Sequence, residues 1–386
     1  MLQEECKEKI LSEEYRDFMM RDTGALGKNF PLENGCRIPL KYGFELFYID
    51  QSEDRKKSLA DYPYTMVPKC YTTLDMAAIQ QAGIAAVQNI PGLELSGEGV
   101  LVGIIDTGIN YLDPIFRNLD GSTRIQRIWD QEEQSGTAPR EIGYGSEYTK
   151  EQINQAILSE NPKETVPSFD TDGHGTFVAS VACGGANPEN LFIGAAPEAE
   201  MVIVKLKEAK EYLREYYFVD RDAGCYQEND LVAAVFYLQK VQEELKRPLV
   251  ICLAVGTSYG GHGGYSILSE YLQNVAASEG IGIVTGSGNE ADKRHHYLGI
   301  LEQENNLPVE INVGNNTRGF VMELWTELPN LLALSIASPT GQTVGPISLK
   351  RGIGEYVFVF EQTRVIFNYR VLVETTGAPL AFFQFE

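Results

Sequence analysis

Apolar, strand-like runs alternate with helical patterns through the middle of this sequence, from about residue 75 to 290. The run Val-Leu-Val-Gly-Ile-Ile at 100–105 is almost unbroken, as expected for a strand that is buried on both faces. Helical patterns follow it, for example at 230–245. Further apolar runs lie at 201–204, 249–255 and 281–284. This alternation predicts an α/β fold with a doubly wound, mainly parallel sheet and helices on both faces.

The regions on either side of this alternation follow other patterns. Residues 1–74 begin with a charged helical pattern at about 5–20 and contain a strand pattern at 42–49. After about residue 305 the helical patterns stop, and Gly, Pro and Asn separate short alternating runs, which predicts an all-β module. Its expected strands are 309–313, 319–324, 332–337, 356–361, 365–373 and 380–385. We therefore divide the chain into an N-terminal region (1–74), an α/β domain (75–304) and a β module (305–386), whose last strand would present an unpaired edge.

The chain is strongly acidic. It has 54 Asp and Glu residues against 32 Lys and Arg, a net charge of -22, which argues against nucleic acids and anionic membranes as its main partners. The N-terminus, Met-Leu-Gln-Glu-Glu, lacks the apolar segment of a secretory signal, and no apolar run is long enough to span a bilayer. These patterns predict a cytoplasmic protein, although a leader that had been removed would leave the same sequence.

Six cysteines are scattered along the chain, at positions 6, 36, 70, 183, 225 and 252. None of them forms a Cys-x-x-Cys pair, and three lie in apolar surroundings. We therefore expect buried free thiols rather than a disulfide framework.

One histidine lies in surroundings that suit a general base. His174 stands between two glycines, directly before the small and apolar run Thr-Phe-Val-Ala. The run predicts a helix with His174 in its first turn, where the positive end of the helix dipole favours a neutral imidazole. The glycines leave space beside the ring for a substrate. Taken alone, His174 fits a packed core histidine better than a catalytic base, and Asp170 and Asp172 could either orient its loop or cap its helix.

Two further polar residues follow buried strands. Asp106 ends the run at 100–105, and Asn289 follows the run at 281–284 on a Gly-Asn turn. Functional residues of open α/β sheets gather at the carboxyl ends of the strands. There, Asp106 could accept a hydrogen bond from His174 and fix its tautomer, and Asn289 could donate to a developing oxyanion. Each motif occurs in many proteins, but the ordered set is much more specific.

These motifs resemble those of the subtilisin-like serine proteases (subtilases), and most closely the clostridial germination-protease (Csp) branch. The motifs are Gly-Ile-Ile-Asp-Thr-Gly-Ile at 103–109, Asp-Gly-His-Gly-Thr-Phe-Val-Ala at 172–179 and Gly-Asn-Glu at 288–290. The resemblance implies that Asp106 and His174 are triad members and that Asn289 is the oxyanion residue. It also implies a primary substrate pocket lined by Ala254, Val255, Gly256, Thr285, Gly286 and Ser287.

The resemblance implies further features of the whole chain. The substrate would be a peptide or protein, and no cofactor or assigned metal site is expected, although calcium stabilises many subtilases. Residues 1–74 would loosely match a propeptide, and the β module a jelly-roll-like insertion in the protease domain.

One part of the family pattern is absent from these 386 residues. Subtilases carry their nucleophile in a Gly-Thr-Ser-x-Ala-x-Pro segment after the oxyanion Asn, and no such segment follows Asn289. The only Gly-Thr-Ser, at 256–258, precedes Asn289, so we interpret Ser258 as a loop residue. Two hypotheses remain. The chain is a truncated serine endopeptidase with an incomplete subtilisin-like sheet, inactive as given and prone to self-association through its uncovered core. Alternatively, it is a non-catalytic pseudoprotease that binds peptides or a partner protease.

Overall fold

The structure is a computed structural model. It describes residues 2–21, 35–54, 58–73, 84–88, 90, 95–189, 192–290, 293–302, 305–330, 332–347, 352–370, 373 and 376–386. The sequence also predicts a helix at 76–87, with Asp75 as its N-cap. That stretch lies mostly outside the described residues, and only its end is described, in α3 (Ile84–Gln88). No helix in the described part of the chain combines the length and apolar character that a membrane span requires.

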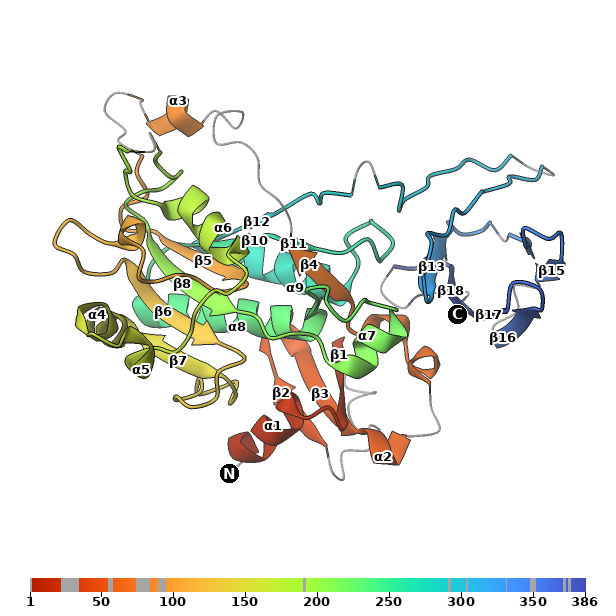
Figure 1. Cartoon of the computed structure of the whole chain (residues 1–386), viewed down its shortest axis with the longest axis horizontal. Helices are drawn as coiled ribbons and strands as arrows, with labels where there is room; N and C mark the ends of the chain where they lie inside the picture. Colours follow the sequence, from red (N-terminus) through yellow and green to blue (C-terminus); the bar gives the residue numbers. More distant parts are fainter. Residues whose placement is uncertain are drawn as a thin grey trace.

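A six-stranded sheet forms the centre of the molecule (Figure 1), in the order β12-β10-β5-β8-β6-β7. Its strands are β5 (Leu101–Asp106), β6 (Ile125–Asp130), β7 (Ser146–Thr149), β8 (Glu200–Lys205), β10 (Leu249–Leu253) and β12 (Ile281–Thr285). Neighbours pair in parallel, except that β7 is antiparallel to β6. The predicted parallel α/β sheet is therefore confirmed, and every residue of β5 is buried, as its apolar run predicted.

Helices cover both faces of this sheet. On one face, Val102 and Ile104 of β5 pack with α6 (His174–Cys183) and α4 (Lys150–Leu158). On the other face, Leu101 and Ile105 pack with α8 (Glu228–Leu245) and α9 (Ile267–Ala276). The alternation of β5 side chains between two cores is what a strand inside a doubly wound sheet requires. Short helices complete this region: η4 (Pro114–Phe116), α5 (Pro162–Thr165) and α7 (Glu211–Tyr216).

The N-terminal region forms a small antiparallel sheet of order β1-β3-β2 beneath α8 and α9. The expected helix at 5–20 is wrong in its second half: α1 covers Leu2–Leu11, and Tyr15–Arg21 form β1. Pairing explains the difference, because all seven residues of β1 pair with β3 (Phe44–Asp50). The other elements are β2 (Cys36–Pro39), η1 (Lys41–Gly43), α2 (Gln51–Asp54), η2 (Leu59–Asp61), η3 (Tyr64–Met66) and β4 (Cys70–Thr73).

A disulfide joins Cys6 of α1 to Cys36 of β2, so the expectation that all cysteines are free thiols is wrong for this pair. The two residues lie 30 positions apart on different elements, and the sequence contains no spacing signal that links them. The other four are free: Cys70, Cys183 and Cys225 are buried and Cys252 is half-buried.

The β module contains a four-stranded sheet of order β13-β18-β17-β16 and a hairpin of β14 and β15. Its strands are β13 (Phe320–Trp325), β14 (Leu334–Ala337), β15 (Thr343–Ile347), β16 (Gly352–Phe358), β17 (Thr363–Arg370) and β18 (Leu380–Phe385). Residues 309–313, expected as a strand, are exposed and form none. The expected unpaired edge is also wrong, because β18 lies between β13 and β17 and all its residues are buried.

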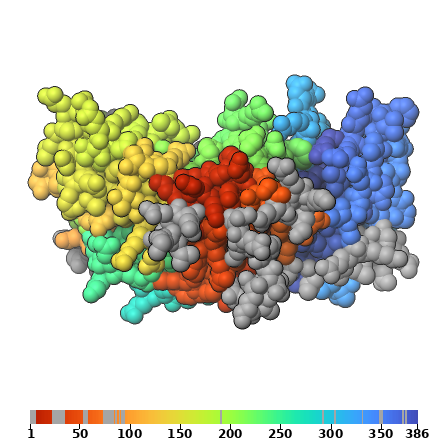
Figure 2. Space-filling view, turned by 90° about the horizontal axis from the view of Figure 1, so that it is seen from below, coloured from red at the N-terminus to blue at the C-terminus, as the bar shows by residue number. Residues whose placement is uncertain are grey.

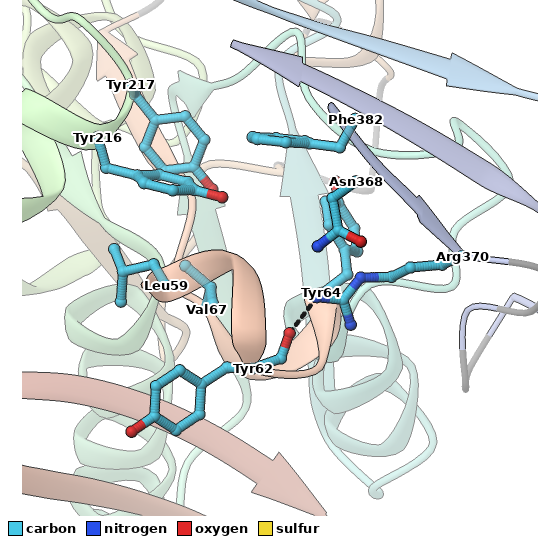
Figure 3. A pocket seen from close by; sticks show the side chains of 9 residues that line it. All are labelled: Leu59, Tyr62, Tyr64, Val67, Tyr216, Tyr217, Asn368, Arg370 and Phe382. Atoms are coloured by element: carbon cyan, nitrogen blue, oxygen red, sulfur yellow. Dashed lines mark hydrogen bonds between the residues drawn. The ribbon is translucent and has the colours of Figure 1, made fainter. Parts of the chain in front are cut away.

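The three regions are in contact. Figure 2 shows the N-terminal region, in red and orange, between the α/β domain and the blue β module. At the seam with the β module, a small pocket is lined by Leu59, Tyr62, Tyr64, Val67, Tyr216, Tyr217, Asn368, Arg370 and Phe382 (Figure 3). Two polar side chains of this pocket bind backbone carbonyls: Arg370 donates to the carbonyl oxygens of Ala60 and Tyr62, and Asn368 to that of Ala60. The seam is thus held by side chains that satisfy N-terminal backbone carbonyls.

A buried polar cluster holds the N-terminal sheet against the α/β domain. The Asp17 carboxylate on β1 accepts hydrogen bonds from Lys210 Nζ (2.5 Å), Gln227 Nε2 (2.9 Å) and Asn229 Nδ2 (3.1 Å). Beside it, Lys207 Nζ lies 2.6 Å from Asp230 Oδ2. Burial lowers the pKa of Lys210, and the charge of Asp17 opposes that effect. Two buried acids and two buried lysines therefore compensate each other, which makes each charge dependent on its partner.

We predict that Lys210→Met destabilises the fold by about 3–5 kcal/mol, because it leaves the Asp17 carboxylate buried without its cation. The free energy of unfolding in urea measures the effect. The double variant Asp17→Asn/Lys210→Met should recover part of the loss. Lys41→Met is the matched control, since the partly exposed Lys41–Glu243 pair should contribute only about 0–1 kcal/mol. Equal stability of Lys210→Met and Lys41→Met would contradict the stabilising role that we assign to the buried Asp17–Lys210 pair.

Candidate active site

The end of β5 and the start of α6 bring an acid and a histidine together. Asp106 is the last residue of β5 and is fully buried, and His174 is the first residue of α6. His174 Nδ1 lies 2.8 Å from Asp106 Oδ1, so the predicted hydrogen bond is present. The same oxygen also accepts the backbone N–H of Thr107 at 2.7 Å. With Nδ1 bound to a carboxylate, Nε2 is the ring nitrogen that can take up a proton from a reacting group.

A second carboxylate, Asp170, fixes the two segments that carry this pair. Its Oδ1 accepts Thr107 Oγ1 (2.9 Å) and the backbone N–H of Gly173 (2.8 Å). Its Oδ2 accepts both the backbone N–H (2.8 Å) and the hydroxyl (2.6 Å) of Thr176. Thr107 Oγ1 in turn accepts the N–H of Gly175 at 2.8 Å. Asp170 therefore does both things that the sequence left open: it binds amides of the first helical turn and it anchors the histidine loop to the loop after β5.

The glycine after His174 has a different purpose from the one expected. A Cβ atom on Gly175 would lie 2.3 Å from the carbonyl oxygen and 2.9 Å from the nitrogen of Gly108. The absence of a side chain thus lets α6 approach the backbone of the loop after β5. Gly173 fits the other reason for glycine, since its φ is 95° and any Cβ would be strained. Close packing of helix on loop, rather than space for substrate, explains Gly175.

The expected substrate pocket contains a strand of the chain itself. Val255 and Gly256 form the short strand β11, which pairs with β4. On its other side β4 pairs with β9 (Tyr226–Gln227), so the N-terminal segment lies as the middle strand between two edges of the α/β domain. Both pairings are antiparallel. An extended segment that adds a strand in this way is a common mode of peptide recognition.

Glu228, the first residue of α8, contacts this strand and was not identified from the sequence. Its carboxylate is fully buried, accepts the backbone N–H of Lys69 at 3.3 Å and the hydroxyl of Tyr71 at 3.4 Å, and lies 3.6 Å from Lys69 Nζ. Burial, and then the negative charge of Glu228, raise the pKa of Tyr71 well above its ordinary value. The sequence signal was weak, because an acidic residue in a first helical turn usually serves the helix dipole.

The remaining predicted residues have no hydrogen bond to the acid–histidine pair within the described part of the chain. Ala254 is buried between β10 and β11, and Thr285, Gly286, Ser287 and Asn289 are exposed at and after the end of β12. Among the hydrogen bonds of the described residues, none joins Asn289 to Asp106 or His174. Ser258 is exposed on the turn after β11, with its carbonyl oxygen 3.4 Å from His262 Nε2. Within the described residues, three or more His, Cys, Asp or Glu side chains nowhere come together as a metal site.

We predict that Asp170→Asn lowers the free energy of unfolding by about 2–3 kcal/mol at pH 7, since an amide cannot accept the same set of N–H and O–H donors. Burial opposes ionisation of Asp170, but hydrogen bonds from Thr176, Gly173 and Thr107 outweigh it and lower its pKa. A carboxyl whose pKa is lower in the folded than in the unfolded chain stabilises the fold when it is ionised. This stabilisation is complete above the unfolded pKa of about 4 and is lost as the pH falls through the folded pKa.

The gap between wild type and Asp170→Asn should therefore narrow below about pH 4, which urea unfolding at a series of pH values measures. Asp172→Asn is the control, because Asp172 is exposed and accepts only the N–H of His174 among the described hydrogen bonds. The role of Asp170 would be refuted if the loss of unfolding free energy in Asp170→Asn did not change with pH. It would also be refuted if this loss equalled that of Asp172→Asn.

Comparison with known proteins agrees with this geometry. The model of the subtilase family (Peptidase S8) matches residues 97–316, more than half of the chain. The chain is 33% identical over 102 residues to subtilisin-like protease SBT2.2 of Arabidopsis thaliana, covering 24% of this chain and 12% of that protein. It is 25% identical over 218 residues to subtilisin of Bacillus sp. (strain TA39), covering 55% and 40%. The structure of the Clostridium perfringens CspB protease matches with a TM-score of 0.67 and 28% identity, over 78% of this chain and 59% of that one.

The chain thus spans less than two thirds of each of these relatives. The matches confirm the resemblance inferred from the motifs at 103–109, 172–179 and 288–290, and they confirm the α/β fold with its added β module.

Proposed function

Because this chain belongs to the subtilase family, we propose that it supplies the acid–base half of a serine endopeptidase site. The observation that carries the proposal is the 2.8 Å contact between His174 Nδ1 and Asp106 Oδ1 at the end of a buried parallel strand. The substrate would be a peptide or protein bound as an extended strand along β11. The proposed roles are orientation by Asp106, proton transfer by His174 and oxyanion stabilisation by Asn289.

Each role follows from the chemistry of the side chain. The Asp106 carboxylate holds the Nδ1–H tautomer and stabilises the imidazolium that forms when Nε2 takes the proton of an attacking serine hydroxyl. Nε2 then returns this proton to the leaving amine. The Asn289 amide would donate to the oxyanion of the tetrahedral intermediate, a contribution of roughly 3–4 kcal/mol to the barrier in such sites. Ala254, Val255, Gly256, Thr285, Gly286 and Ser287 would line the primary pocket.

The nucleophile, in this proposal, is not Ser258 and lies outside these 386 residues. Ser258 is exposed on the turn that follows β11, a strand assigned here to the substrate pocket. No Gly-Thr-Ser-x-Ala segment follows Asn289 within the sequence. The exposure of β12 supports a further chain segment beside it. Val284 of β12 is 58% exposed, whereas strands of a parallel α/β sheet are usually covered on both faces.

We further propose that residues 1–74 act as a propeptide-like inhibitory region, with 75–304 as the protease domain and 305–386 as an inserted β module. The position of β4 supports this, because it fills the groove between β9 and β11 that a substrate would occupy. The same observation favours the second candidate function, a pseudoprotease that binds peptides in this groove without cleaving them.

A fluorophosphonate probe distinguishes the two functions. We predict that it labels the protein encoded by the complete open reading frame and does not label residues 1–386 alone. Replacing His174 by Ala should abolish labelling of the complete protein, and Ser258→Ala should leave it unchanged. Labelling of Ser258 would refute our assignment, and absence of labelling in the complete protein would favour the pseudoprotease. Gel filtration of residues 1–386 tests the accompanying proposal that the open edge of β12 causes self-association.

A further inference from the structure

Two free cysteines meet where the N-terminal strand enters the substrate groove. Cys70 is the first residue of β4 and pairs with Gln227, and Tyr71 pairs with Tyr226. Cys225 lies two residues before Gln227, so its side chain falls on the same face of the ladder as that of Cys70. Both thiols are free, and both residues are buried in one apolar cluster.

We propose that Cys70 and Cys225 are a redox-modification site, whose disulfide covalently retains β4 between β9 and β11. Within the described residues, β4 pairs with its neighbours at four positions, two on each side, and Glu228 adds hydrogen bonds to Lys69 and Tyr71. With the disulfide, the strand could not leave the groove even if those pairs opened. The inference rests on the proposed function in one respect: it assumes that a substrate peptide binds between β9 and β11.

The surroundings of Cys225 make it the more reactive of the two thiols. The neighbouring Cys70 thiol lowers the pKa of Cys225, burial opposes this, and the nearby Arg214 guanidinium lowers it further. The Cys225 thiol, followed by burial, raises the pKa of Cys70. Arg214 also fixes the loop before Cys225, since it donates to the carbonyl oxygens of Asp220, Arg221 and Ala223 and pairs with Glu208 at 2.9 Å.

The oxidant would be a low-molecular-weight disulfide. The Cys225 thiolate attacks one of its sulfur atoms, forms a mixed disulfide and releases one thiolate. Cys70 loses its proton and attacks the Cys225 sulfur, which releases the second small thiol. Overall, the two cysteines lose two protons and two electrons, and the small disulfide gains them as two thiols. The product is a disulfide with an S–S bond of about 2.05 Å between Cys70 and Cys225.

The other two free cysteines provide an internal control. Burial raises the pKa of Cys183 to about 12 and that of Cys252 to about 11, so neither forms a thiolate at neutral pH. Both belong to the core beneath α6, away from β4. A reaction that depends on the thiolate should therefore select Cys225.

The test is oxidation of the reduced 386-residue chain by oxidised glutathione at pH 7.5, followed by denaturing alkylation and peptide mapping. We expect a peptide that links Cys70 to Cys225, with Cys183 and Cys252 still alkylated, and no such peptide in Cys70→Ala or Cys225→Ala. Cys252→Ala should behave as wild type. Hydrogen exchange at residues 70–73 should slow at least tenfold in the oxidised wild type and remain unchanged in the two variants that lack the pair.

Absence of the linked peptide, or equal oxidation of Cys183 and Cys252, would overturn the proposal. So would unchanged exchange at residues 70–73 in the linked chain. The oxidation assay requires no proteolytic activity, and the fluorophosphonate assay requires no cysteine. Failure of the disulfide proposal can therefore be distinguished from failure of the proposed protease function. Two independent variants keep the test decisive if one of them folds poorly.

Discussion

The Asp170 carboxylate is the interaction on which the site geometry depends. Its two oxygens receive four hydrogen bonds, from the loop after β5 and from the first turn of α6. The acid–histidine pair has one hydrogen bond of its own, at 2.8 Å, and its two residues lie 68 positions apart. A single bond between side chains cannot hold two backbone segments in register, whereas a buried carboxylate that accepts backbone amides from one and a threonine hydroxyl from the other can. The positioning of His174 is thus a property of Asp170 and Gly175 as much as of Asp106.

The sequence predicted those parts of the fold and site that depend on local patterns. The apolar run at 100–105 can be stable only as a buried strand, and the carboxyl ends of parallel strands lie at one edge, so Asp106 and His174 could be placed together in advance. The positions of residues 70–73 and of Asp17 could not be predicted in this way. The pairing of Cys70 with Gln227 and the bond from Gln227 to Asp17 join segments that are far apart in the chain and have no shared periodicity. For the same reason residues 15–21 were assigned to a helix, although pairing with β3 makes them a strand.

Buried polar groups, rather than apolar area alone, specify how the three regions meet. Asp17 orders the N-terminal sheet on α8 through Lys210, Gln227 and Asn229. Glu323 does the same for the β module: it accepts the hydroxyl of Tyr64 (2.7 Å), the N–H of Gly260 (2.8 Å) and Trp325 Nε1 (2.9 Å). An apolar seam would tolerate sliding, whereas each of these carboxylates loses several hydrogen bonds if its region shifts by one residue.

The two halves of the candidate site differ in how firmly they are built. Asp106 and His174 stand on β5 and α6, which lie inside the sheet and in a fully packed core. Asn289 and the residues 285–287 follow β12, an edge strand that pairs only with β10 and whose outer residues are exposed. An oxyanion donor must be held within about 0.5 Å of its productive position, and that precision comes from packing around the donor. In the proposed function, proton transfer by His174 would therefore be organised by the core around β5, whereas the contribution proposed for Asn289 would depend on a covering of β12 that fixes its turn.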